Sequence, residues 1–130
     1  IILEDNKTYD AVIFLRPDMK YINKLDVNIL KNIDNNNVYI PNFCIFNNFN
    51  DRFFISNIKN GLKYGLLFDE LLEYSKFKEL HSETFHYDKI VKEYKLKVNL
   101  TNFYFNRVRA NGKELSNDYK NRRLKVNYIN

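Results

Sequence analysis

The sequence is poor in the residue types on which many enzyme motifs depend. Cys44 is its only cysteine, which excludes an internal disulfide and a Cys-x-x-Cys zinc site. With 3 glycines, it contains no Gly-x-x-x-x-Gly-Lys-Ser/Thr phosphate loop, no Gly-x-Gly-x-x-Gly dinucleotide motif and no Gly-x-Ser-x-Gly nucleophile turn. Its 2 histidines, His81 and His86, do not have the i, i+4 spacing of a helical zinc-protease motif. Asparagine, which tolerates left-handed backbone conformations, is expected to replace glycine in the loops.

Long hydrophobic runs are also missing. No apolar run reaches the roughly 18 residues of a transmembrane helix, and no signal peptide with a small-residue cleavage site is present. Hydrophobic residues still make up 45% of the 130 residues and aromatic residues 16%, which is enough for a packed core. Because the chain begins at Ile1, we expect residues 1–130 to be a single-domain fragment of a longer protein. The single thiol fits a reducing compartment such as the cytoplasm.

The net charge of +5 is compatible with a nucleic acid, an anionic surface or a phosphorylated small molecule as partner. The basic residues are scattered among acidic ones, and this pattern indicates mostly solvated surface. The densest basic patches lie late in the chain, at Arg107 and Arg109 and at Lys120, Arg122 and Arg123.

Hydrophobic periodicity predicts a mixed α/β fold. Residues 10–16 form a nearly continuous apolar run that Pro17 ends, which is typical of a central strand covered on both faces. Further strands are expected at residues 38–41, 52–55, 95–100 and 102–109, and helices at residues 24–33, 57–74 and 82–94. Asp26, Ser56 or Asn57, and Ser82 are the expected helix caps, and Asn111-Gly112 is the expected tight turn.

In the long central helix, apolar residues recur at helical spacing and are expected to face the core. They are Leu62, Gly65, Leu66, Phe68, Leu71, Leu72 and Phe77.

Two polar clusters lie next to predicted strands. Arg16-Pro17-Asp18 follows the first strand, at the carboxyl end where α/β sheets bind ligands. Asn50-Asp51-Arg52 precedes the strand at residues 52–55. Each cluster is equally well explained as a turn with an ion pair. Carboxylate oxygens suit Mg²⁺ or Mn²⁺, whereas arginine suits phosphate.

Two further clusters lie later in the chain. Ser82 and Glu83, a cap and a first-turn carboxylate, are sufficiently explained as the start of a helix. His81, just before them, adds a side chain that can bind a ligand or carry a proton. Arg107 and Arg109 alternate with period two, so they share one face of a strand and would form a phosphate clamp or an exposed edge.

The ordered succession of these motifs resembles a family of glycosyltransferase-like proteins from microbes, algae, fungi and large DNA viruses. The resemblance extends from Tyr9 to Gly112. Its motifs are YDAVIFLRPDM (residues 9–19), VYIP (38–41), NDRFFIS (50–56), YG (64–65), LHSETF (80–85) and RVRANG (107–112).

The resemblance implies the carboxyl-terminal part of a GT-A-like, Rossmann-like transferase domain whose nucleotide-binding half precedes Ile1. Such an enzyme transfers a sugar from a nucleotide-sugar donor to a hydroxyl acceptor such as a glycan. Asp18 would bind a divalent metal (Mn or Mg) or the donor diphosphate, and Arg16, Arg107 and Arg109 would neutralise the phosphates. Arginine stands where the family's pattern has a first aspartate, so this element offers a metal one carboxylate instead of two.

For the catalytic base, the resemblance favours Glu83 at the start of a helix, with Asp51 as the alternative. His81 would be a metal or phosphate ligand, and Asn50, Asp51 and Arg52 would contact the acceptor or sugar. Two other hypotheses stay open: a basic, aromatic-rich nucleic-acid-binding module, for which the chain has 10 Tyr and 11 Phe, and an inactive transferase-like scaffold.

Overall fold

A computed structural model describes residues 7–115 of the protein. In chain order its elements are strand β1 (Val12–Leu15), strand β2 (Met19–Tyr21), 3-10 helix η1 (Val27–Asn32), strand β3 (Asn37–Pro41), strand β4 (Phe53–Ser56), helix α1 (Ile58–Gly65), 3-10 helix η2 (Leu67–Glu70), helix α2 (Leu71–Ser75), helix α3 (Ser82–Tyr87), π-helix η3 (Asp88–Glu93), and strands β5 (Lys97–Thr101), β6 (Phe105–Val108) and β7 (Glu114–Leu115). The α/β class predicted from the sequence is confirmed, and the basic patch at Lys120, Arg122 and Arg123 lies outside the described residues.

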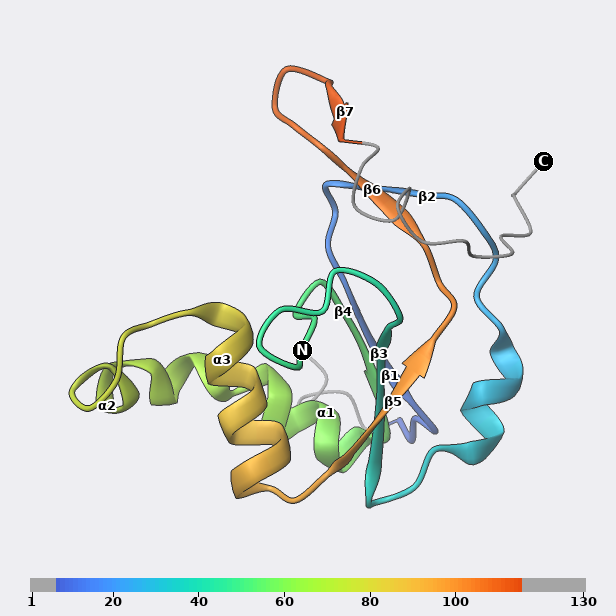
Figure 1. Ribbon diagram of the computed structural model, residues 1–130. Helices are drawn as coiled ribbons and strands as arrows, with labels where there is room; N and C mark the ends of the chain where they lie inside the picture. Colours follow the sequence, from blue (N-terminus) through green and yellow to red (C-terminus); the bar gives the residue numbers. More distant parts are fainter. Residues whose placement is uncertain (1–6, 116–130) are drawn as a thin grey trace.

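Four strands form a mixed sheet in the order β1-β4-β3-β5. Strand β4 is antiparallel to both β1 and β3, whereas β3 and β5 are parallel. Strands β1, β3 and β5 therefore run in one direction, and their carboxyl ends meet at one edge of the sheet (Figure 1). That edge is where an α/β sheet presents its loops to ligands.

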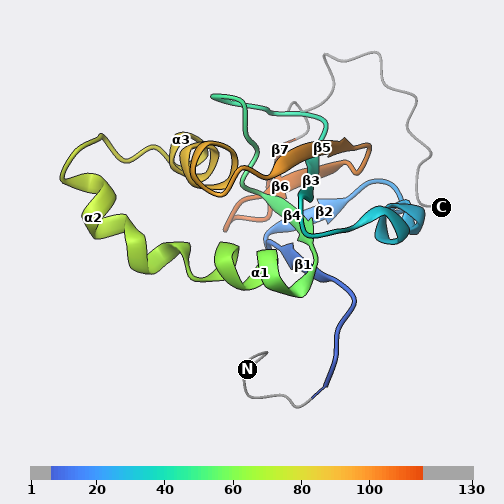
Figure 2. The same cartoon turned by 90° about the horizontal axis from the view of Figure 1, so that it is seen from below.

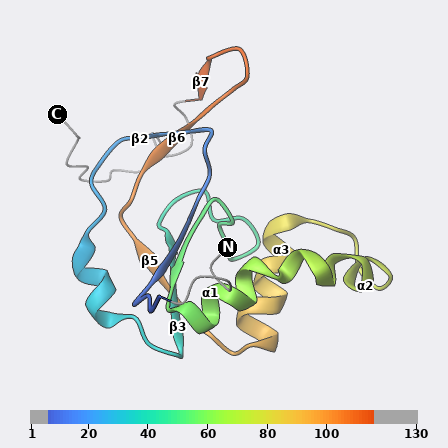
Figure 3. The same ribbon diagram turned by 180° about the vertical axis from the view of Figure 1, so that it is seen from behind.

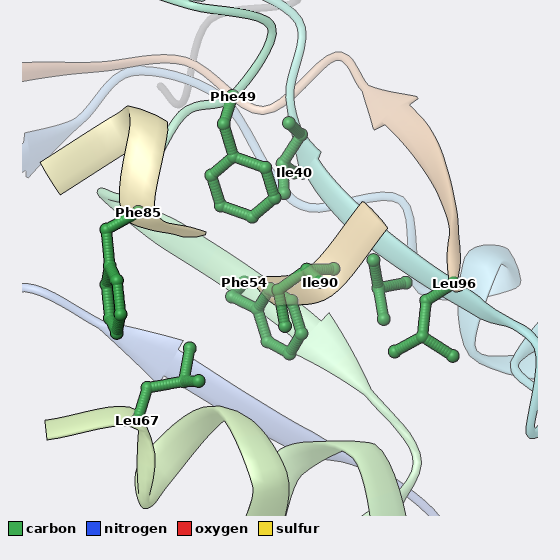
Figure 4. Close-up of a cluster of buried hydrophobic side chains, with 8 residues drawn as sticks. Ile40, Phe49, Phe54, Leu67, Phe85, Ile90 and Leu96 are labelled. Atoms are coloured by element: carbon green, nitrogen blue, oxygen red, sulfur yellow. The ribbon is translucent and has the colours of Figure 1, made fainter. Parts of the chain in front are cut away.

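Strand β4 lies between two hydrophobic cores. All four of its residues are at most 1% exposed. Phe54 points to the layer formed by α1, η2, α3 and η3, where it packs with Ile40, Phe85 and Ile90 (Figure 4). On the other face, Phe53 and Ile55 pack in a second cluster with residues of β2, β6 and the segment around η1. Seen from below, the helix layer and η1 lie on opposite sides of the sheet (Figure 2).

A second, antiparallel sheet was not predicted. It has three strands in the order β2-β6-β7. Strand β2 pairs with β6 over only three residues, which is too short to give a recognisable alternation in the sequence. Stacked aromatic rings join it to the core: Tyr21 lies 5.2 Å from Phe103, centroid to centroid.

The first strand is confirmed, but its predicted central position is wrong. Within the described residues β1 is an edge strand, bonded only to β4. Val12 and Phe14 face the helix layer, whereas Ile13 and Leu15 are 41% and 54% exposed. A continuous apolar run was interpreted as burial on both faces, but only neighbouring elements can supply the second cover.

The long helix predicted at residues 57–74 is broken into α1, η2 and α2. After Gly65 the chain turns into a 3-10 segment and α2 extends away from the sheet (Figure 1). Helical spacing therefore places only some of its apolar residues against the core, Leu71 among them. Leu66, Phe68, Leu72 and Phe77 are between 51% and 83% exposed, contrary to the prediction.

Several local predictions are confirmed. The Asp26 and Asn57 side chains cap η1 and α1 by accepting from Asn28 N and Asn60 N. The predicted cap at Ser82 is wrong by one residue, since His81 is the N-cap of α3. Asn47 and Asn48 adopt positive φ angles of 45° and 67°, as expected of asparagine substituting for glycine.

Helix α1 approaches β1 closely at Gly61. A β-carbon there would lie 2.9 Å from Val12 Cβ, inside normal contact distance, whereas one at Gly65 would lie 3.4 Å from the nearest atom of Phe14. Only the first glycine is required by this packing.

We predict that Gly61→Ala lowers the free energy of unfolding by about 1–3 kcal/mol, because overpacking forces α1 away from the sheet. Gly65→Ala, the matched control, should be neutral or stabilising by up to about 1 kcal/mol, since alanine is the better helix former. Urea unfolding of both variants measures the difference. Equal effects would show that the close approach is unimportant.

A buried carboxylate, Asp88, joins α2 to η3. Asp88, whose side chain is 9% exposed, forms ion pairs with Lys78 (2.5 Å) and Lys92 (2.7 Å) and accepts from Tyr74 Oη at 2.8 Å. Hydrogen bonds from the two lysines hold the pKa of Asp88 well below its usual range. Burial, reinforced by the Asp88 hydrogen bond, raises the pKa of Tyr74 to about 12.

Asp88 should therefore contribute stability that is present above its unfolded pKa of about 3.9 and is lost as the pH falls towards its lowered folded pKa. We expect Asp88→Asn to lower the free energy of unfolding at pH 7 by about 1–3 kcal/mol. It should also flatten the decline of stability below about pH 4. Denaturation curves between pH 2 and 7 test this, with Glu93→Gln as the exposed control. An acid decline that is unchanged in Asp88→Asn would contradict it.

Candidate functional site

Three of the predicted motifs meet at the edge of the mixed sheet where β1, β3 and β5 end. Arg16 follows β1, and Asp51 comes just before β4. Because β1 and β4 are antiparallel, with Leu15 opposite Phe53, these two segments reach the same end of the sheet. The start of α3, with Ser82, lies at that end as well (Figures 1 and 3).

Arg16 and Asp18 form a two-point ion pair across Pro17. Arg16 Nε donates to Asp18 Oδ1 at 2.9 Å, and one Nη donates to Oδ2 at 2.7 Å. Hydrogen bonding to Arg16 lowers the pKa of Asp18, and the same bond raises the pKa of Arg16. Both side chains are nearly half exposed, at 46% and 41%, so the pair is open to a ligand.

The late arginine motif lies next to this pair. Val108 N donates to Asp18 O at 2.9 Å, which joins the end of β6 to the turn after β1. The positive charge of Arg109 contributes, as a lesser cause, to the lowered pKa of Asp18. Arg107 lies in β6 opposite Met19 and is half-buried, whereas Arg109 is exposed beyond the strand.

Asp51 connects the sheet to helix α3. Its carboxylate accepts a short hydrogen bond from the Ser82 hydroxyl. Its negative charge also reaches Arg16 and contributes to the raised pKa of that guanidinium. Tyr64 Oη donates to the Asp51 carbonyl at 3.4 Å, and burial, followed by the Asp51 charge, raises the Tyr64 pKa.

Asn50 holds the loop that presents Asp51. It is 1% exposed. Its Nδ2 donates to Phe43 O at 2.6 Å and its Oδ1 accepts from Arg52 N at 2.9 Å. Both ends of the amide are thus bonded to backbone, which is a loop-fixing arrangement. Arg52 is 8% exposed, so its guanidinium is also enclosed by protein.

His81 and Glu83 lie at the start of α3. His81 Nδ1 is 3.5 Å from Glu83 Oε2 and 3.2 Å from both Asn47 Nδ2 and Thr84 Oγ1. Asn47 also donates to Thr84 Oγ1 at 2.8 Å, so the loop after β3 is fastened to the helix. The Glu83 side chain is 15% exposed, whereas that of His81 is 52% exposed.

Asp51, Ser82 and His86 do not form a nucleophilic triad. In such a triad the carboxylate orients the histidine, and the histidine accepts the serine proton. Here the carboxylate bonds the serine directly, and His86 Nδ1 lies 2.8 Å from the Ser82 carbonyl oxygen. Ser82 is therefore placed to orient Asp51, not to act as a nucleophile.

A pocket of about 430 Å³ opens beside Ser82, between the end of β1 and the helix layer. We call it the Ser82 pocket. Its walls include Phe14, Leu67, Leu71 and Phe85, and Ser82 and His86 lie at its polar side. Among the residues that the structure describes, no acidic, lysine or arginine side chain lines it.

The described residues offer a poor site for a divalent metal. No group of three or more His, Cys, Asp or Glu side chains is close enough among residues 7–115 to hold one. Both oxygens of Asp18 already accept from Arg16. Asp51 Oδ2 accepts from Ser82. The donor set around Asp18 thus suits an anion through its arginines better than a cation through its carboxylates.

No family model matches the sequence, and neither the curated proteins nor the solved structures compared with it give a match. Among the helices of the described part of the chain, none has the length and apolar character needed to cross a bilayer.

Sequence reasoning missed the residues that connect the motifs. Ser82 was interpreted as a helix cap, and Asn47, Tyr64 and Thr84 were given no role, although Tyr64 and Thr84 lie within the quoted motifs. Their contacts join segments that are 13 to 37 positions apart in the chain. The one hint was the general expectation that asparagine replaces glycine in loops, which the positive φ angles of Asn47 and Asn48 match.

The exposure of the Arg16–Asp18 pair predicts that it contributes little to stability. Exposed ion pairs contribute about 0–1 kcal/mol, so we expect Arg16→Gln and Asp18→Asn to leave the free energy of unfolding within about 1 kcal/mol of the parent. Urea unfolding, run beside the buried Asp88→Asn, measures this. A decrease in the free energy of unfolding above about 2 kcal/mol would show that the pair stabilises the turn between β1 and β2.

Proposed function

We propose that the protein is the acceptor-side part of a GT-A-like glycosyltransferase, which transfers a sugar from a nucleoside diphosphate donor to a hydroxyl acceptor. One observation carries this proposal: Arg16, Asp51, Ser82 and the Arg109 strand end, far apart in the sequence, lie at one edge of the sheet. The order of motifs resembling glycosyltransferase-like proteins supports it.

In this proposal Arg16 and Arg109 bind the donor diphosphate. Arg16 uses Nε and one Nη for Asp18, which leaves its other Nη for a phosphate oxygen. As the bond between the anomeric carbon and the diphosphate breaks, the electron pair goes to the leaving phosphate oxygen. Fixed guanidinium groups stabilise the charge that develops there. Asp18 orients Arg16, and because the donor set around Asp18 fits a metal poorly, no step depends on one.

The catalytic base in this proposal is Asp51. Its carboxylate would accept the proton of the acceptor hydroxyl while that oxygen bonds to the anomeric carbon. Ser82 fixes the carboxylate, and the field of Arg16 reaches it. Glu83, the base that the sequence favours, is the second candidate. Its side chain is 15% exposed, and His81 Nδ1 lies 3.5 Å from its carboxylate.

The nucleic-acid alternative is less well supported by the surface. It requires exposed aromatic rings on a basic face. Phe68 and Phe77 are 78% and 83% exposed, but they flank a segment that carries Asp69, Glu70 and Glu73. Carboxylates at these positions repel phosphates.

The test uses the purified full-length protein, because the resemblance implies a nucleotide-binding half that precedes Ile1 and the fragment alone is expected to be inactive. The donors are UDP-, GDP- and dTDP-sugars, with CMP-sugars as donors that lack a diphosphate. We expect hydrolysis or transfer with one diphosphate donor. Arg16→Gln and Asp18→Asn should each weaken donor binding and turnover by about 10- to 100-fold, and Asp51→Asn should reduce turnover about 100- to 1,000-fold with donor binding nearly intact. Binding is measured by calorimetry and turnover by release of the nucleoside diphosphate.

Asp69→Asn, an exposed carboxylate away from the site, is the control and should have no effect. Full activity of Asp18→Asn would remove the central claim. If Glu83→Gln abolishes turnover and Asp51→Asn does not, the base is Glu83. Donor binding without any turnover would identify an inactive scaffold, and addition of Mn²⁺ or EDTA shows directly whether a metal takes part.

A further inference from the structure

The Ser82 pocket is large enough for a ligand group and is not used by the proposed chemistry. Its volume of about 430 Å³ lies in the range of roughly 300–1,000 Å³ that is typical of small-molecule sites. The walls come from β1, α1, η2, α2 and α3, so the pocket is formed by elements that pack together in the core rather than by one loop.

The pocket has an apolar end and a polar end. Phe14, Leu67 and Phe85 form apolar walls. The histidine and serine side chains that line it are His81, Ser82 and His86, which come from the N-cap, the first residue and the last turn of α3. A ligand in this pocket would therefore place its apolar part against the core and its polar end towards Ser82.

The polar end of the pocket is next to the proposed base. Ser82 lines the pocket and donates to Asp51. Tyr64 lines it as well and donates to the Asp51 carbonyl. A hydroxyl at this end of the pocket would lie beside the carboxylate that the proposed reaction requires.

The lining selects against charge. Among residues 7–115, none that lines this pocket is Asp, Glu, Lys or Arg, so its apolar end would remove the hydration of a phosphate or carboxylate without supplying a charged partner. The neighbouring hollow of about 670 Å³ is the opposite case, since charged residues such as Glu70, Asp88 and Lys89 line it and form ion pairs with lysines or glutamates. Of these two hollows, the Ser82 pocket is the one that suits an uncharged apolar group.

We propose that the Ser82 pocket binds the apolar part of the acceptor, so that the acceptor is an alcohol carrying an uncharged aromatic or aliphatic group. That the ligand is an acceptor rests on the proposed function, but the preference of the pocket for an apolar group can be measured without turnover. A cavity of about 150 Å³ already holds benzene, so 430 Å³ accommodates a ring with substituents or a short alkyl chain.

Three alcohols test the proposal: benzyl alcohol, 1-hexanol and ethanol. Each has one hydroxyl, and they differ in whether a ring, a chain or neither is attached. We expect benzyl alcohol or 1-hexanol to bind at least about 10-fold more tightly than ethanol, by ligand-observed NMR titration. The ranking of the first two distinguishes an aromatic from an aliphatic group.

Two variants locate the binding. Gly65 lines the pocket, and its β-carbon position is 3.4 Å from Phe14 Cζ, so Gly65→Leu should fill the space and abolish the preference. Leu80 also lines the pocket and is half-exposed, so Leu80→Ser should weaken the preference about 3- to 10-fold without disturbing the packing of the core. Leu72→Ser is the matched control, because Leu72 is 72% exposed and does not line the pocket.

Equal affinity for the three alcohols, no binding of any of them, or a preference that survives both lining variants would overturn the proposal. Its failure is distinguishable from failure of the transferase. A preference lost in Gly65→Leu, in a protein that hydrolyses no nucleotide sugar, supports the pocket and rejects the transferase. Transfer to ethanol and benzyl alcohol at equal rates supports the transferase and rejects the pocket.

Discussion

Burial of β4 on both faces is the constraint on which the rest of the structure depends. Four consecutive residues with at most 1% exposure need a cover on each side, and the chain supplies it with the helix layer over Phe54 and with β2, β6 and the η1 segment over Phe53 and Ile55. Antiparallel pairing with β4 then fixes where β1 ends. The same pairing that buries the core therefore places Arg16 beside the segment that carries Asp51.

The candidate site is assembled from loop and helix ends whose backbone is fixed by asparagine. Asn50 uses both ends of its amide inside the loop after β3, and Asn47, in a left-handed conformation, donates to the start of α3. Rigid positioning of this kind matters for catalysis because reacting groups must approach to about 3 Å. The polar groups available to a ligand are thus held by neighbours that are themselves hydrogen-bonded.

Stability and the site use different charges. The Asp88 carboxylate is buried and joins α2 to η3 through lysines that are themselves more than half exposed, whereas both members of the Arg16–Asp18 pair are nearly half exposed at the sheet edge. Exposed pairs contribute little to folding but keep their field accessible to a ligand. Substitutions at the edge can therefore alter binding without unfolding the protein. The proposed chemistry can therefore be tested by substitutions that leave the fold intact.

The sequence by itself determined the α/β class, most strands, the Asp26 and Asn57 caps and the residue types of the site, because periodicity and capping depend on near neighbours. It did not determine that β1 lies at an edge, that the helix after β4 breaks at Gly65, or that β2 exists. Nor did it show that Ser82 bonds Asp51 rather than only starting a helix. Those features depend on contacts between residues far apart in the chain, whose partners no local pattern specifies. Tertiary packing alone decided which exposed charges and which apolar walls lie beside one another.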